Sequence, residues 1–322
     1  MDLNDQTINT LVSNLSSDSH TTCLAALRHL RILSNQDPTA RPLISAAGAI
    51  PHLLHALFSS SHSIQDNAAA TLLNLSISDR RPLLSTPHLL DAIAHLLSRH
   101  ATTSSPTAVQ SAAATLHCLL SHVPEFRATV GASHDILHSL LRIMESPDSP
   151  RRSVKDALKA SFGIALHPPN RAILVRLGAV SALFHLVTKE RKKRIGIMED
   201  ATAVIAQIAG CEESEEAFRE ASGIPLLSSL LGCDASSLRT KENAVSGLLN
   251  LVRCSGNKET VMEVRERAVA TVETLDGIIY VQDHGSAKGK SKAVALLKIV
   301  FDGGSSCNNN NCSDLYPIDP DL

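Results

Sequence analysis

Two stretches decide the fold of this chain: residues 48–54, which read GAIPHLL, and residues 67–76, which read NAAATLLNLS. A second copy of this pair occurs at residues 223–227 (GIPLL) and 243–252 (NAVSGLLNLV). A third, less complete copy begins at residues 178–180 (GAV). One pattern repeated at a regular interval indicates a solenoid, because each unit can bury its apolar face only against its neighbours.

The interval between copies can be measured from the alanine-rich segment. The positions equivalent to Asn67 are Ala25, Ser111, Asp156, Asp200, Asn243 and, more weakly, Lys292. Neighbouring positions lie 42 to 45 residues apart, except for a last step of 49 residues. Alanine and leucine are strong helix formers, so we expect an all-α solenoid of about six to seven units, with a degraded unit as the terminal cap.

The repeat also sets the expected domain organisation. The solenoid covers residues 1–302, and the remainder, 303–322, is rich in Gly, Ser, Asn and Pro and is expected to be a disordered polar tail. The approximate units are 6–36, 37–78, 79–123, 124–168, 169–215, 216–258 and 259–302.

Composition excludes several classes of function. The chain has no Trp and few aromatic residues, so Leu, Ala, Ile and Val must form the core. A net charge of −2 gives no general attraction to nucleic acid. No apolar run approaches the roughly 18 residues that span a bilayer. Seven cysteines without the spacing of a disulfide framework favour a reduced intracellular protein. We expect it in the cytoplasm, the nucleus or both. We also expect it to be a monomer.

Local signals place the turns and the loops. Gly48 supplies a permissive backbone between two apolar segments, and Pro51 falls in the first turn of the next helix. Polar insertions at 101–106, 146–150 and 189–194 fall between the same two helices of successive units. In the last unit, we expect a loop at 284–289 and a closing helix that starts near Lys292.

On these residues, the chain resembles an armadillo-repeat protein, over about residues 6–301. The GAIP turn and the NAA…LLNLS helix are similar to the pattern of that family. Within the family, the chain is most similar to the repeat region of plant U-box ubiquitin ligases. The segments that carry this finer resemblance are 155–160 (KDALKA), 199–210 (EDATAVIAQIAG) and 285–293 (GSAKGKSKA). The resemblance implies an armadillo-type α-solenoid, a right-handed superhelix of three-helix repeats whose third helices line a concave groove.

The resemblance also points to candidate binding residues. Importin-type members read basic peptides with a Trp and an Asn four residues apart on the third helix. Here the Asn position is Asn, Cys, Gly, Gln and Asn along the chain, at positions 74, 118, 163, 207 and 250. The Trp position never carries Trp, being Ala70, Ala114, Lys159, Ala203 and Ser246, so an importin-like function is not expected.

The predicted contacts for a bound polypeptide are Asn74, Lys159, Gln207, Asn250 and Arg253. The Asn side chains have two open interpretations, because an amide can hold a bound peptide or can bond to neighbouring backbone.

The leading hypothesis is a non-enzymatic scaffold that binds a protein partner, such as a ubiquitination substrate or a kinase, without a cofactor. The alternative is the substrate-recognition part of a plant U-box ubiquitin ligase. Because the first repeat-like helix begins close to Met1, no U-box is expected ahead of it.

Other motifs give weaker signals. Cys307 and Cys312 supply only half of a tetrahedral zinc site, and His134 and His138 are more simply surface residues. We therefore expect no metal and no catalytic residue. The basic run at 189–194 is interpreted as a solvated loop or, alternatively, as a nuclear-localisation or acidic-partner patch.

Overall fold

The computed structural model of the chain describes residues 3–99, 105–190, 195–255 and 257–301. It divides into two compact units, Met1–Ala160 and Ser161–Leu322, and the division falls within helix α11. All regular secondary structure in the described residues is α-helical, which confirms the predicted all-α class. The expected tail, 303–322, and most of the basic run, 191–194, lie outside the described residues.

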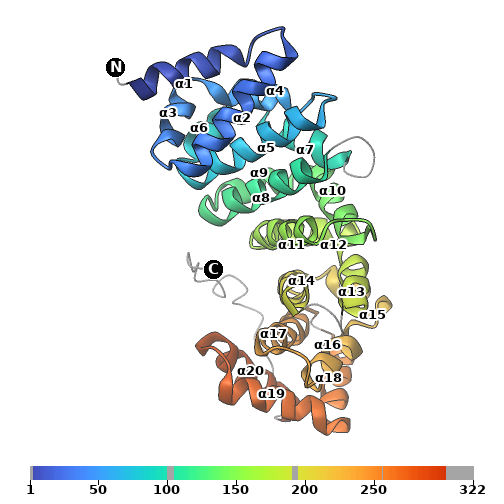
Figure 1. Ribbon diagram of the computed structural model, residues 1–322. Helices are drawn as coiled ribbons and strands as arrows, with labels where there is room; N and C mark the ends of the chain where they lie inside the picture. The colour runs from blue at the N-terminus through green and yellow to red at the C-terminus, as the bar shows by residue number, and fades with distance from the viewer. Residues whose placement is uncertain (1–2, 100–104, 191–194, 256, 302–322) are drawn as a thin grey trace. The chain divides into compact units, whose positions relative to one another are not determined.

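Both units consist of a series of α-helices, which Figure 1 labels in chain order. The helices that lie in the first unit or begin there are α1 (Leu3–Asn14), α2 (His20–Gln36), α3 (Ala40–Ala46), α4 (Ala49–Ala56), α5 (His62–Ile77), α6 (Arg81–Ser85), α7 (Leu89–Ser98), α8 (Pro106–His122), α9 (Phe126–Gly131), α10 (His134–Glu145) and α11 (Arg151–Ala165). Those of the second unit are α12 (Pro168–Arg176), α13 (Ala179–Glu190), α14 (Ile195–Ile208), α15 (Ser214–Glu220), α16 (Gly223–Leu231), α17 (Leu238–Ser255), α18 (Lys258–Ala270), α19 (Val272–His284) and α20 (Ala287–Phe301).

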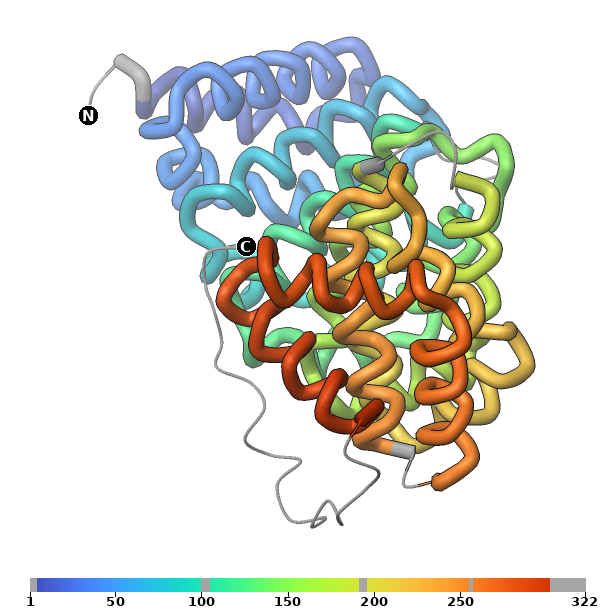
Figure 2. The backbone as a smooth tube through the Cα atoms, turned by 90° about the horizontal axis from the view of Figure 1, so that it is seen from below, coloured from blue at the N-terminus to red at the C-terminus, as the bar shows by residue number. Residues whose placement is uncertain are grey.

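After α1 and α2, the helices form triplets in which the third member is the longest, as in α3, α4 and α5. The third helices of successive triplets pack against one another: α5 against α2 and α8 in the first unit, and α17 against α14 and α20 in the second. Figure 2 shows α17 beside α20 as Figure 1 does. These layers of third helices make the fold an armadillo-type α-solenoid.

Small residues let the third helices approach closely. On α5, Ala68 and Ala69 are buried together with Leu72, and on α8, Ala112 and Ala113 are buried. Alanine faces bring helix axes close together, and the leucines fill the space that remains. The expectation of a core built from Leu, Ala, Ile and Val is confirmed.

In four of the six triplets, the turn between the first two helices contains a left-handed residue, as far as the described residues show. Gly48 and Gly178 adopt φ values of 84° and 88° there, as the sequence predicts for Gly48. In two other triplets, the same role falls to His88 (φ 62°) and Ser222 (φ 51°). Left-handed backbone strains a residue that carries a Cβ, so the turns at His88 and Ser222 are strained in comparison with the turns at Gly48 and Gly178.

The alignment of Gly48 with Gly223 is therefore off by one residue. The left-handed residue stands three positions before the proline, which makes Ser222 before Pro225 the equivalent of Gly48 before Pro51. Gly223 serves another purpose, because a Cβ there would lie 2.8 Å from both the Phe184 and the Phe218 rings. The sequence pattern alone could not separate these two reasons for glycine.

The closing helix also differs from the expectation. The loop predicted at 284–289 is shorter, and α20 begins at Ala287 rather than near Lys292. Gly289 lies inside α20, where a Cβ would meet the Glu242 carboxyl group at 2.6 Å. The glycines that suggested a loop instead allow α20 to approach α17 closely.

Candidate functional site

The five predicted contact residues all lie on third helices. Asn74 on α5 and Lys159 on α11 belong to the first unit, while Gln207 on α14 and Asn250 and Arg253 on α17 belong to the second. Arg253 is exposed and the other four are partly exposed. Asn250 packs beside α14, which carries Gln207, and Arg253 follows Asn250 by about one turn. The residues therefore fall on the third-helix face of the first unit and on the third-helix face of the second unit.

The two asparagines tie neighbouring third helices together. Asn74 Nδ2 donates to Ser34 Oγ at 3.0 Å and more distantly to the Arg31 carbonyl oxygen at 3.5 Å, both on α2. Asn250 Nδ2 donates to the Ala206 carbonyl oxygen on α14 at 2.8 Å. The structural interpretation of the Asn position is therefore observed, and each amide keeps its oxygen for other contacts.

The same position is filled differently in other repeats. Cys118 Sγ donates to the Ser76 carbonyl oxygen at 3.1 Å, so a thiol makes the same kind of bridge between α8 and α5. The Oε1 atom of Gln207 is buried and has no hydrogen-bond partner in the described residues. Gln207 therefore does not reproduce the bridge through that oxygen.

An acidic residue holds the start of the next third helix in three repeats. Asp66 Oδ1 accepts hydrogen bonds from Ser105 Oγ and Thr107 Oγ1 at the start of α8. Glu199 Oε1 accepts from Ser237 Oγ at 2.7 Å, and Glu242 Oε1 accepts from the backbone N–H of Ser286 at the start of α20. A carboxylate at a helix N-terminus is favoured by the unpaired N–H groups and by the helix dipole.

Sequence reasoning did not identify these acidic caps. The signal was present, because Asp66, Glu199 and Glu242 each stand one position before an equivalent of Asn67. The caps fix how successive third helices align, and so they fix the spacing of any contact residues on them.

The third-helix face of the first unit carries a neutral histidine beside a lysine. Burial, together with the nearby charges of Lys159 and His122, lowers the pKa of His117 to about 4. On α11, burial raises the pKa of Asp156, against the effect of a hydrogen bond that Gln110 Nε2 donates at 3.3 Å. At neutral pH, His117 therefore adds no charge, and Lys159 is a cation on this face.

The third-helix face of the second unit is more positive. Lys292 Nζ on α20 donates to Ser246 Oγ on α17 at 3.1 Å. Burial lowers the pKa of Lys292, the cations Lys288 and Arg253 lower it further, and Glu242 opposes them. Three cations and one carboxylate therefore influence one another at the contact between α17 and α20. Of these residues, only Arg253 was predicted. Glu242 and Ser246 lie on the same helix as Arg253, whereas Lys288 and Lys292 come from the next repeat along the chain.

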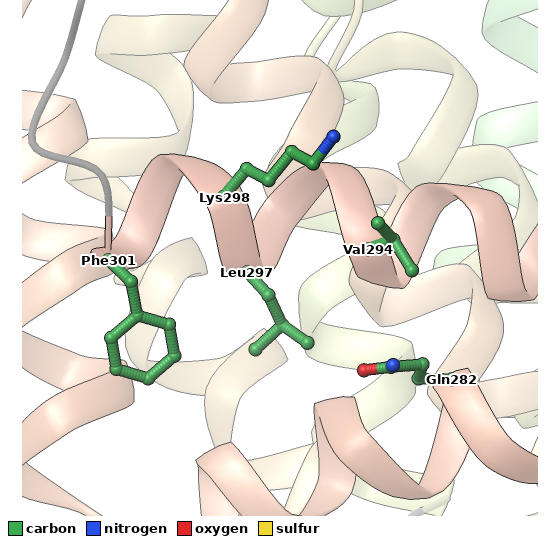
Figure 3. Close-up of a pocket in the computed structure, with 5 residues that line it drawn as sticks. All are labelled: Gln282, Val294, Leu297, Lys298 and Phe301. Carbon is green, nitrogen blue, oxygen red and sulfur yellow. The ribbon is translucent and has the colours of Figure 1, made fainter.

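Two small pockets lie in the second unit. One, of about 260 Å³, is lined by Gln282, Val294, Leu297, Lys298 and Phe301 on α19 and α20 (Figure 3). The other, of about 370 Å³, includes Asp234, Lys241, Glu273 and Tyr280 among its lining residues, and Lys241 Nζ lies 5.4 Å from the centre of the Tyr280 ring. Val294, Tyr280 and Phe301 are among the large apolar side chains exposed on the last triplet.

The other candidate sites can be followed only in the part of the chain that the structure describes. Within the described residues, no group of three or more His, Cys, Asp or Glu side chains could hold a metal ion. His134 and His138 are both exposed on α10, and Cys307 and Cys312 lie outside the described residues. Among the helices described, none alone is long and apolar enough to cross a membrane, and only one sharply bent pair, α12 with α13, meets the length and composition test jointly.

Successive helical triplets with stacked third helices define the class of protein as armadillo-repeat. The family model described as the plant U-box protein ARM repeat region matches residues 7–317. The chain belongs to this family, which confirms the finer resemblance found in the sequence.

The curated relatives are plant proteins. The chain is 28% identical over 302 residues to U-box domain-containing protein 17 of Arabidopsis thaliana, a match that covers 93% of this chain and 39% of the relative. It is 29% identical over 292 residues to U-box domain-containing protein 1 of Medicago truncatula, covering 90% of this chain and 40% of the relative. The chain thus spans about two fifths of the length of these relatives.

Solved structures show the same fold. The crystal structure of an engineered protein aligns with a TM-score of 0.76 at 20% identity, over 91% of this chain and 68% of that chain. A designed armadillo repeat protein aligns with a TM-score of 0.51 at 20% identity, over 91% of this chain and 99% of that chain. A further match, with a TM-score of 0.50 and 20% identity over the same shares of both chains, is described as designed for modular peptide recognition.

Proposed function

We propose that this chain is a non-enzymatic scaffold that binds a segment of a partner protein along the exposed sides of its third helices. The observation that carries the proposal is the placement of Asn74, Lys159, Gln207, Asn250 and Arg253. All five are at least partly exposed on helices whose buried residues are mostly apolar. Polar groups at regular intervals on a rigid apolar framework are suited to orienting a bound polypeptide.

The spacing of the third helices supports an extended segment as the ligand. Packed helices lie about 8–10 Å apart, and an extended chain advances about 3.3 Å per residue. Neighbouring third helices that both carry a contact residue, such as α14 and α17, therefore offer one polar contact for about every three residues of a bound strand. Asn74 and Asn250 each use Nδ2 within the protein, which leaves Oδ1 to accept an N–H from the ligand.

Membership of a family named for plant U-box proteins agrees with this proposal, as does the fold shared with a protein designed for peptide recognition. The proposal itself depends on the residues of the third-helix faces.

A selection of short peptides from a random displayed library, on the immobilised chain, tests the proposal. We expect selected peptides to bind the purified chain by fluorescence anisotropy and to lose about tenfold in affinity when Lys159→Ala and Arg253→Ala are combined. This pair leaves the hydrogen bonds of Asn74 and Asn250 in place. Asp91→Ala, on an exposed part of α7, is the control. Failure to select any peptide, or equal affinity for the variant and the wild type, would contradict the proposal.

A second candidate function follows from the family match. The chain would recognise substrates for a plant U-box ubiquitin ligase, since it corresponds to about two fifths of such relatives. A reconstituted ubiquitylation reaction with a bound partner tests this candidate. We expect modification of the partner only when a U-box protein is present. Transfer supported by the purified chain alone would overturn the non-enzymatic assignment.

A further inference from the structure

Four serine or threonine residues of the chain stand directly before a proline: Thr86, Ser105, Ser146 and Ser149. Proline has no backbone N–H and holds the preceding residue in extended backbone. A protein kinase that modifies such a pair must accept both features, and kinases of this class are called proline-directed. The structure separates the four pairs by what each hydroxyl group already does.

Two of the four hydroxyl groups are used by the fold. Ser105 is buried, and its Oγ atom donates to the Asp66 carboxylate in the acidic cap of α8. Thr86 Oγ1 donates to the Pro82 carbonyl oxygen at 2.7 Å. Phosphorylation of either oxygen would remove the donated proton, and at Ser105 it would place a doubly charged group beside a carboxylate.

The other two hydroxyl groups lie in the short loop between α10 and α11. Ser146 and Ser149 are partly exposed, and Pro147, Asp148 and Pro150 beside them are exposed. In the described part of the chain, neither Oγ atom makes a hydrogen bond, while the backbone N–H of Ser149 donates to the Ser146 carbonyl oxygen at 3.3 Å. Both hydroxyl groups can therefore react without the loss of a bond that holds the fold.

The residues that follow distinguish Ser149 from Ser146. Arg151 and Arg152 stand two and three positions after Ser149 and are exposed on the first turn of α11. The same positions after Ser146 are Asp148 and Ser149. Positive charge after the proline suits a kinase with an acidic substrate groove, whereas negative charge there opposes binding to such a groove.

The start of α11 can open with the loss of few hydrogen bonds. The first four N–H groups of a helix have no partner within it, and helix ends fray. A bond at this start runs from the Val154 N–H to the Pro150 carbonyl oxygen at 3.1 Å. Arg151 and Arg152 can therefore leave the helical turn and extend the segment that begins at Ser149, which is the form that a kinase holds.

We propose that Ser149 is a phosphorylation site for a proline-directed protein kinase that selects basic residues after the proline, with ATP as the phosphoryl donor. Ser149 Oγ attacks the γ-phosphorus of ATP, the bond from that phosphorus to the oxygen bridging the β-phosphate breaks, and ADP leaves with the electron pair. The hydroxyl proton passes to a carboxylate base of the kinase. The inference concerns regulation and stands independently of the scaffold proposal.

The surroundings of Ser149 also favour the product. A phosphate on Ser149 carries close to two negative charges and lies just ahead of α11, where the helix dipole favours an anion. The exposed side chains of Arg151 and Arg152 can pair with it from the same turn. Lys159 follows Arg152 on this helix by about two turns, so the modification adds negative charge to a helix that carries a predicted contact residue.

The test incubates the purified chain with ATP and one of two purified kinases. One is a proline-directed kinase of the cyclin-dependent class, and the other is a basophilic kinase that selects arginine before the serine. Mass spectrometry locates the phosphate and follows its rate of incorporation. We expect the first kinase to modify Ser149 at least about tenfold faster than Ser146, which is the matched site in the same loop, and Ser149→Ala to abolish this modification.

The arginines are tested by the double variant Arg151→Ala, Arg152→Ala, for which we expect kcat/KM at Ser149 to fall about tenfold. Arg28→Ala is the control, because Arg28 is an exposed arginine on α2 of the same unit, and we expect a change within about twofold. In the phosphorylated chain, hydrogen exchange in the first turn of α11 should slow about threefold. Circular dichroism confirms that each variant retains its helical content.

A synthetic peptide with the sequence of residues 143–155 tests access to the loop in the folded chain. Phosphorylation of the peptide but not of the chain would overturn the inference, as would equal rates at Ser146 and Ser149. Modification of Ser149 by the basophilic kinase alone, or an unchanged rate in the double variant, would overturn it as well. None of these outcomes affects the selection of peptides by the immobilised chain, so the scaffold proposal is tested separately.

Discussion

The third helices α5 and α17 carry nearly the same ending, LLNL, yet the two faces around them differ in charge. In the first unit, Asn74 bonds to α2, and the next third helix contributes His117, which is neutral at pH 7. In the second unit, Asn250 bonds to α14, and the next third helix contributes Lys292. The repeat thus maintains the bond that aligns its helices, while the residues beside that bond give each face its own chemistry.

The acidic caps should give the largest effect, and a similar one in each unit. We expect Asp66→Ala to lower the free energy of unfolding of the first unit by about 2 kcal/mol, because the start of α8 loses its acceptor. Glu242→Ala should destabilise the second unit to a similar extent, because the backbone N–H of Ser286 at the start of α20 loses its acceptor. Urea denaturation measures both effects.

Glu266→Ala is the control for the caps, because Glu266 is an exposed carboxylate within α18 and away from a helix start, and we expect a change below about 0.5 kcal/mol. A loss of less than about 0.5 kcal/mol after Asp66→Ala or Glu242→Ala would contradict the assignment of these carboxylates as caps.

Lowering the pH should destabilise the first unit through protonation of His117. The pKa of His117 lies at about 4 in the folded chain, below its ordinary value of 6.5, so the unfolded chain binds more protons between these values. The stability that neutral His117 contributes is complete above pH 6.5 and is lost as the pH falls through 4. We expect the wild type to lose about 1–2 kcal/mol more than His117→Gln over this range, after allowance for partial exposure.

Urea denaturation at a series of pH values measures the acid effect. His20→Gln is the control, since His20 is exposed at the start of α2. A pH profile of His117→Gln that matches the wild type would contradict the assignment.

The asparagine bridges should matter equally in both units. We expect Asn74→Ala and Asn250→Ala each to lower stability by about 1 kcal/mol, because each removes a hydrogen bond between third helices. Hydrogen exchange should speed up in α2 and α5 for the first variant and in α14 and α17 for the second. If either substitution leaves exchange unchanged and only weakens peptide binding, the amide serves the ligand and not the fold.

The two strained turns should give the smallest effect. We expect Ser222→Gly to raise stability by about 0.5–1 kcal/mol, because glycine removes the Cβ strain at positive φ. His88→Gly should gain less, since it also loses the 2.8 Å contact between His88 Nδ1 and Asp91 Oδ2. Thermal unfolding measures both changes, with Gly48→Ala as the opposite control. A stabilisation by His88→Gly larger than that by Ser222→Gly would contradict this account.

The sequence predicted the local structure correctly where a residue and its immediate neighbours determine the backbone conformation. Gly48 turns the chain and Pro51 opens α4, because backbone conformation depends on the residue and its immediate neighbours. The prediction was wrong where a glycine is required by a residue that is distant in the sequence. Gly223 leaves room for two phenylalanine rings, and Gly289 leaves room for Glu242. Those contacts join different helices and leave no local pattern.

The sequence by itself determined the helical repeat, its period, the solenoid class and the family. The reason is that the apolar positions which each unit buries recur at helical spacing in every unit. It also placed Asn74, Lys159, Gln207, Asn250 and Arg253 on third helices. Only the tertiary structure decided that the two asparagine amides bond to the preceding helix, and that Lys292 joins Ser246 beside Arg253. Hydrogen bonds and charge repulsion depend on distances of a few ångströms, and packing alone sets these distances between residues roughly 40 positions apart.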